Sequence, residues 1–118
     1  MLGGCAAIDA NRRHEQSNIH PPNFRSEIIL FMRTYLNDPT QVRGAFISEP
    51  VVRSFEGGDR YSVCVRYNAK KAGGQYAGSK DSIAIFRDAR FDRMIDSGRE
   101  QCKDAAYLPF PEIEQLSR

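Results

Sequence analysis

The first regular pattern of apolar residues in the chain begins after Asn23 and has the period of a helix. These residues recur every three or four positions and share one helical face, at Phe24, Ile28, Phe31, Met32, Tyr35 and Leu36. Ile29 and Leu30 widen this face. Asn23 suits the N-cap, and residues 37–39 end the pattern at a proline, which cannot continue a helix. The pattern predicts an amphipathic helix that packs on a sheet.

Beyond Arg43 the apolar residues change to a period of two, which predicts β-strands. Residues 44–48 and 51–53 are expected to form one strand that Pro50 interrupts, since proline within a strand indicates a sheet edge or a bulge. Residues 55–59 contain two glycines and an aspartate and supply the turn that follows.

The clearest alternation lies in residues 60–86, which predict a β-hairpin. Its first strand alternates polar residues and Cys64 with four apolar ones, Tyr61, Val63, Val65 and Tyr67. Glycines let the chain reverse near residues 71–75, and residues 82–86 form the predicted return strand. We expect this hairpin to form the middle of the sheet.

Residues 91–95 alternate again and predict a fourth strand. The predicted fold is therefore α+β, with one N-terminal helix packed on an antiparallel meander of three to four strands. In the C-terminal part, residues 100–106 are compatible with one or two helical turns. Residues 107–111 contain two prolines and are expected to be largely extended. The apolar residues of this tail indicate that it is pinned to the sheet.

Composition places the chain among ordinary globular proteins. It has 118 residues, 41% hydrophobic and 27% charged, which is enough for a single domain with one modest core. No apolar run approaches the roughly 18 residues that a membrane-spanning helix needs. The 17 basic and 15 acidic residues leave a net charge of only +2, which gives little reason to expect nucleic-acid binding.

The N-terminal residues 1–22 are predicted to be a truncated lipobox and a flexible tether, with the single small domain in residues 23–118. Leu2-Gly3-Gly4-Cys5 is similar to the motif at which bacterial lipoproteins are lipidated, where small residues precede the acylated cysteine. A complete signal also has a basic start and an apolar stretch, whereas here only two residues precede the motif. The alternative is a chance match. We expect a lipid anchor at Cys5 and a location at the periplasmic face of a bacterial membrane.

The two remaining cysteines, Cys64 and Cys102, are expected to pair in an oxidising periplasm. Cys64 shares its face with polar residues, so the bridge would pin the tail across the less apolar side of the sheet. The alternative is two free buried thiols in a cytosolic protein. Both histidines, His14 and His20, lie in the N-terminal segment, so we expect no catalytic cysteine, no metal site and no cofactor.

The hairpin loop is the candidate binding site, because loops on a rigid scaffold commonly carry binding residues. Its glycines, aromatic residue and basic rim give the candidate set Arg66, Asn68, Lys70, Lys71, Gly73, Gly74, Tyr76, Gly78 and Lys80. A phosphate-binding loop is the alternative. Such a loop has its lysine after the glycines at the start of a helix, whereas here the lysines come first and a strand follows.

Several of these segments carry a family resemblance. Leu36-Asn37-Asp38-Pro39, Val63-Cys64-Val65-Arg66-Tyr67-Asn68-Ala69-Lys70, Gly73-Gly74-Gln75-Tyr76-Ala77-Gly78 and Cys102 resemble a group of small uncharacterised bacterial envelope proteins, many with a lipoprotein or secretory signal. That pattern has asparagine at the position of Lys71 and lacks Gln75. The resemblance covers residues 24–102 and implies location and fold, because the group has no assigned activity.

Three classes of function follow from these features. The first is a non-enzymatic envelope lipoprotein that binds a protein or cell-wall partner through the loop of residues 68–78. The second is an enzyme, an inhibitor or a small-ligand-binding domain that uses carboxylates such as Asp81 and Asp88 or a pocket between helix and sheet. The third is nucleic-acid binding through the basic rim, which would require a salt-dependent affinity. The sequence favours the first class.

Overall fold

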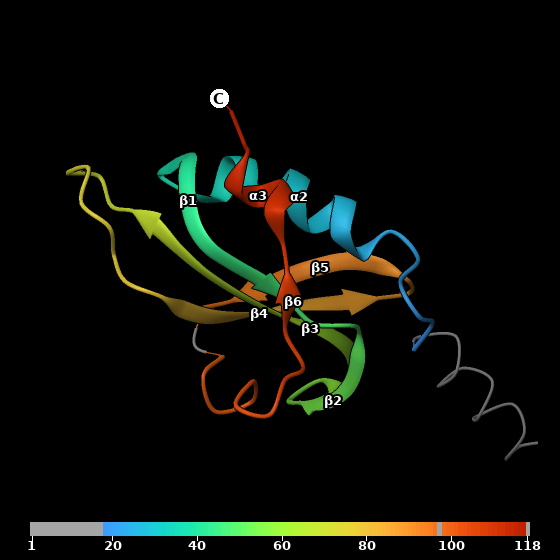
Figure 1. Ribbon diagram of the computed structural model, residues 1–118. Coiled ribbons are helices and arrows are strands. Elements are labelled where there is room, and N and C mark those ends of the chain that lie inside the picture. The colour runs from blue at the N-terminus through green and yellow to red at the C-terminus, as the bar shows by residue number, and fades with distance from the viewer. Residues whose placement is uncertain (1–17, 97, 118) are drawn as a thin grey trace, which may run out of the picture.

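The computed structural model describes residues 18–96 and 98–117, so the Leu2-Gly3-Gly4-Cys5 motif and most of the predicted tether lie outside the described residues. The elements follow in the order α2 (Phe24–Tyr35), β1 (Asp38–Ile47), β2 (Val51–Phe55), β3 (Gly58–Lys70), β4 (Lys80–Arg87), β5 (Arg90–Ile95), β6 (Leu108–Pro109) and α3 (Pro111–Glu114) (Figure 1). No helix in these ranges is long and apolar enough to cross a membrane.

The strands form one antiparallel sheet in the order β5-β4-β3-β1-β6, with β2 also paired to β3. The α+β architecture with an antiparallel sheet is confirmed, but the six strands exceed the predicted three to four. One extra strand arises because the predicted single strand is interrupted after Ile47. Ile47 pairs with Val65 of β3, and pairing with β3 resumes only at Val51, opposite Ser62. The other is β6, which comes from the tail.

Ser48 explains how the sheet accommodates the break at Pro50. Its backbone N–H donates to the Cys64 carbonyl at 2.9 Å, and its Oγ accepts the Cys64 N–H at 2.9 Å. The side chain thus replaces the strand partner that the broken ladder lacks, which leaves the backbone of Cys64 satisfied although it is buried. The predicted interruption at Pro50 is confirmed, but the prediction of one strand across it is wrong, because β1 ends at Ile47 and β2 begins at Val51.

β1 begins earlier than the sequence indicated, at Asp38 directly after the helix. Its pairing with β3 is irregular, with register shifts on both sides of Arg43. Gln41 and Gly44 have positive φ angles of 58° and 55°, which marks the bulges. Each extra residue reverses the faces of the side chains that follow, so the alternation from which a strand is predicted is lost before residue 44.

The main core lies between the sheet and the two helices. Ile28 and Met32 of α2 are fully buried there against the inward residues of β3, which include Val63, Val65 and Tyr67. The predicted helix, its packing on the sheet and the inward face of β3 are therefore confirmed. Leu30 is 64% exposed and does not extend the buried face, because it points away from the sheet. We call this side of the sheet the helix face.

A second, smaller core lies on the opposite side of the sheet, the disulfide face. Cys64 and Cys102 are bonded here, with their Cα atoms 5.9 Å apart, and pack with Ile83 and Ile85. The predicted pairing is confirmed. From the disulfide the tail passes along the edge of β1 as β6 and reaches the helix face, where α3 lies beside α2 (Figure 1). The tail therefore contacts both faces of the sheet and pairs with its β1 edge.

The turn between β4 and β5 offers a stabilising substitution. Asp88 and Ala89 have φ angles of 51° and 68°, the left-handed pair that a two-residue hairpin of this twist requires. A side chain with a Cβ costs about 1–2 kcal/mol in this conformation, whereas glycine adopts it freely. We expect Ala89→Gly to raise the free energy of unfolding by about 0.5–1 kcal/mol, measured by urea denaturation.

Ala72→Gly is the matched control, because Ala72 lies in the loop between β3 and β4 and is not among the residues with a positive φ. There the same exchange only increases the freedom of the unfolded chain and should leave stability unchanged or lower. A loss of stability in Ala89→Gly would contradict this description of the turn.

Candidate functional site

The loop between β3 and β4 extends beyond the end of the sheet (Figure 1). Its backbone is held by internal hydrogen bonds, from Lys71 N–H to the Gln75 carbonyl at 2.7 Å and from Gly74 N–H to the Lys71 carbonyl at 2.9 Å. Gly74 and Gly78 have φ angles of 86° and 97°, which explains why glycine occupies these positions. The loop thus has a defined shape and presents the exposed Gly73 at its tip.

Two of the predicted binding residues tie the loop to the sheet. The Tyr76 hydroxyl donates to the Gln41 carbonyl at 2.7 Å, and the Arg43 guanidinium lies 4.1 Å from the centre of the Tyr76 ring. The Asn68 side-chain oxygen accepts the Gly78 N–H at 2.9 Å. Tyr76 is half-buried by these contacts. Both side chains therefore position the loop, and its outer surface is left to the lysines and glycines.

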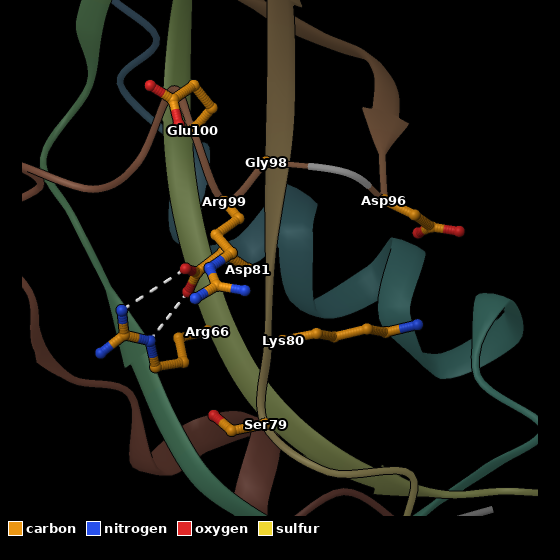
Figure 2. A pocket seen from close by; sticks show the side chains of 8 residues that line it. All are labelled: Arg66, Ser79, Lys80, Asp81, Asp96, Gly98, Arg99 and Glu100. Atoms are coloured by element: carbon orange, nitrogen blue, oxygen red, sulfur yellow. Dashed lines mark hydrogen bonds and ion pairs between the residues drawn. The ribbon is translucent and has the colours of Figure 1, made fainter.

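A hollow of about 750 Å³ lies at the base of the hairpin, along the edge of β4 that β5 leaves unpaired. It exists because β5 pairs with β4 only as far as Ile83, while β4 continues to Lys80. The chain after β5 then crosses to the disulfide, with the Gly98 N–H bonded to the Asp81 carbonyl at 3.0 Å. Figure 2 shows the side chains around the hollow, which are Arg66, Ser79, Lys80, Asp81, Asp96, Arg99 and Glu100, together with Gly98.

Gly98 has a steric role in this crossing. A Cβ added there would lie 2.8 Å from the Cγ1 of Ile83 and 3.2 Å from the Asp81 carbonyl oxygen. Only glycine lets the chain approach β4 this closely, and the approach places Arg99 and Glu100 at the rim of the hollow.

One wall of the hollow is a fixed network around Asp81. Arg66 Nε donates to Asp81 Oδ1 at 2.8 Å, and the Tyr107 hydroxyl donates to the same oxygen at 3.1 Å. The Arg66 guanidinium also lies 4.5 Å from the centre of the Tyr107 ring. Burial raises the pKa of Tyr107, and the Asp81 charge raises it further. The hydrogen bond to Asp81 raises the pKa of Arg66. The guanidinium of Arg66, a predicted binding residue, is thus neutralised by its ion pair with Asp81.

The other two carboxylates of the hollow also have donors. Asp96 accepts a hydrogen bond from the Tyr35 hydroxyl, and the pKa of Tyr35 is raised by burial first and then by this contact. Glu100 pairs with Lys103 at 3.0 Å. Within residues 18–96 and 98–117, neither Lys80 nor Arg99 forms an ion pair. The hollow is therefore lined by three cations and three carboxylates, and two of the carboxylates, Asp81 and Glu100, are paired with a cation.

A second hollow, of about 360 Å³, lies between the C-terminal end of α2 and the hairpin. Lys70, Lys71 and Lys80 contribute to its walls, and Lys80 also lines the first hollow. The structure therefore brings four predicted residues, these lysines and Arg66, to two adjoining hollows.

Among the residues of this region that were not predicted from the sequence are Arg43, Asp96 and Arg99. Arg43 lies in a bulged part of β1, and the other two flank a crossing that no periodic pattern marks. Their places depend on contacts between distant segments, which a reading of local patterns does not detect.

Comparison with known proteins adds no further evidence: no family model, no curated protein and no solved structure matches this chain. The resemblance to bacterial envelope proteins stays a prediction.

Proposed function

We propose that this chain is a non-enzymatic binding module of the bacterial cell envelope, tethered through Cys5, which recognises a protein or cell-wall partner at the hairpin end of its sheet. The Leu2-Gly3-Gly4-Cys5 motif supports the anchor. The Cys64–Cys102 disulfide supports an oxidising compartment, because such bonds persist in the periplasm and are rare in the cytosol.

The observation that carries the proposal is the ordered loop between β3 and β4, on a sheet to which the disulfide joins the C-terminal tail. The loop is held by its own backbone bonds and by Tyr76, so a partner would find a preformed surface. Preformed surfaces bind with a smaller loss of conformational entropy than flexible ones. The lysines at the base of the loop supply the charge for recognition.

The hollow of about 750 Å³ favours a second candidate, the binding of a small ligand, because its volume lies in the range of known ligand pockets. Catalysis by paired carboxylates is less favoured. Asp81 is held by Arg66 and Tyr107, while Asp88 lies in the turn after the opposite end of β4, roughly 20 Å away along the strand.

Photo-crosslinking in bacterial cells that carry the natural gene with its upstream sequence tests the proposal. A photoreactive amino acid replaces Gly73, where an added Cβ has no neighbour within 4 Å, and in a control it replaces the exposed Glu56 at the turn between β2 and β3. We expect a discrete adduct from position 73 in the membrane fraction and none from position 56. Cys5→Ala should move the protein to the soluble fraction.

Two results would contradict the proposal. The same adducts from both positions, or none from position 73, would remove the hairpin as the recognition surface. Retention of Cys5→Ala in the membrane fraction would remove the lipid anchor.

A further inference from the structure

Four cations surround the base of the hairpin and form what we call the basic surface: Lys70, Lys71, Lys80 and Arg99. None forms an ion pair with a residue that the structure describes. Lys70 donates to the uncharged Gln41 side chain, and the Lys80 ammonium lies 5.8 Å from the centre of the Tyr67 ring. Lys71, Lys80 and Arg99 are exposed. The basic surface therefore offers unneutralised positive charge to a ligand.

The carboxylates nearby cancel only part of this charge. Asp81 is bound by Arg66 and Tyr107, and Asp96 is bound by Tyr35. Glu100 is paired with Lys103. An anionic ligand would thus meet four cations without an ion pair among the described residues, and one carboxylate of the hollow, Asp96, whose partner is the uncharged Tyr35 hydroxyl. Charge complementarity therefore points to an anionic ligand.

The spacing of the cations favours a ligand with several carboxylates. Lys80 pairs with Tyr67 in the sheet, and Lys70 lies three residues farther along β3, which is about 10 Å of strand. Lys71 continues in the same direction, while Arg99 lies on the other side of Lys80, in the first hollow. One carboxylate does not reach cations this far apart. Acidic residues at alternate positions of an extended peptide are about 7 Å apart and can reach neighbouring ones.

The place where the chain enters the domain argues against the anchoring membrane as the occupant, a step that rests on the proposed function. His20 packs against Tyr61, with ring centres 5.4 Å apart, near the start of β3. The basic surface lies at the opposite end of β3, about 30 Å away along the nine residues from Tyr61 to Lys70. The chain therefore enters the domain at the end remote from the basic surface, so the anchor does not by itself bring the bilayer to this surface.

We propose that the basic surface binds an extended acidic peptide segment of a protein partner, with carboxylates at Lys80 and Arg99. Electrostatic contacts of this kind set orientation and rate of association as well as affinity. The hollow between these two side chains gives the segment a place to lie where β5 stops and β4 continues.

Fluorescence anisotropy with a labelled eight-residue peptide of alternating Glu and Thr tests this proposal. We expect the purified full chain to bind it and to ignore the same peptide with Gln in place of Glu. Lys80→Gln and Arg99→Gln should each weaken binding about two- to fivefold, and together about tenfold. Added salt should weaken binding further, because exposed charges are screened.

Arg87→Gln is the matched control, since Arg87 is an exposed cation at the other end of the same strand. It makes the same change in net charge and should alter the affinity less than twofold. Thermal melting should show that all four variants remain folded, because the substituted side chains are exposed.

Several outcomes would overturn the inference: no binding of the Glu peptide, equal binding of the Gln peptide, or an equal loss with Arg87→Gln. Binding of phosphatidylglycerol vesicles that depends on Lys80, without peptide binding, would assign the surface to a membrane instead. If the peptide fails while the position-73 adduct persists in cells, the proposed function stands and the acidic peptide is excluded.

Discussion

Replacing Cys64 and Cys102 together by alanine is expected to lower the free energy of unfolding by about 2–5 kcal/mol. The disulfide closes a segment with a sequence separation of 38 residues, for which the chain-entropy estimate is about 4 kcal/mol. Both cysteines are also fully buried in the smaller core, so their removal takes packing from Ile83 and Ile85 as well. Since small domains have only about 5–15 kcal/mol in total, this loss should be visible as a large shift of the urea midpoint.

The measurement is best made in a Cys5→Ala background, which prevents mispairing of the thiols. Cys5 lies outside the described residues, in the predicted tether, and its substitution alone should leave the unfolding curve unchanged. Reducing the protein that retains Cys64 and Cys102 should reproduce most of the loss. A change below about 1 kcal/mol would show that the tail is held by packing alone.

The elements that the sequence predicted well are those with regular local patterns. The helix was recognised because Ile28 and Met32 recur on one face, and the first hairpin strand because Val63 and Val65 alternate with polar residues. The Cys64–Cys102 pair was predicted because these are the two cysteines that remain besides Cys5 and because an oxidising periplasm was expected. In each case the local pattern and the tertiary environment require the same conformation.

The parts that were missed depend on contacts between distant segments. Two bulges remove the alternation of apolar and polar residues from the start of β1, so the sequence did not predict that the strand begins at Asp38. The tail was expected to be extended and pinned, but nothing local showed that it crosses from the disulfide face to the helix face. Arg99 joined the candidate site only because the close approach of Gly98 to β4 brings it there.

Phe110→Ala is expected to lower the free energy of unfolding by about 3–5 kcal/mol. Phe110 comes from the tail yet is fully buried in the main core, among residues of the sheet and α2. Its N–H donates to the Ala45 carbonyl at 2.9 Å, and the Arg25 guanidinium lies 5.0 Å from the centre of its ring. Truncation leaves a cavity beneath α3, because the surrounding sheet collapses only partly around the missing ring.

Leu108→Ala is the control for Phe110→Ala, because Leu108 lies two residues earlier in the same tail and is 54% exposed. It should cost less than about 1 kcal/mol. If the disulfide alone fastened the tail, both substitutions would have the same small effect. A large loss confined to Phe110→Ala would show that the tail is a structural part of the helix face, so that the edge of the sheet is held from both sides: by a covalent bond below and by a buried ring above.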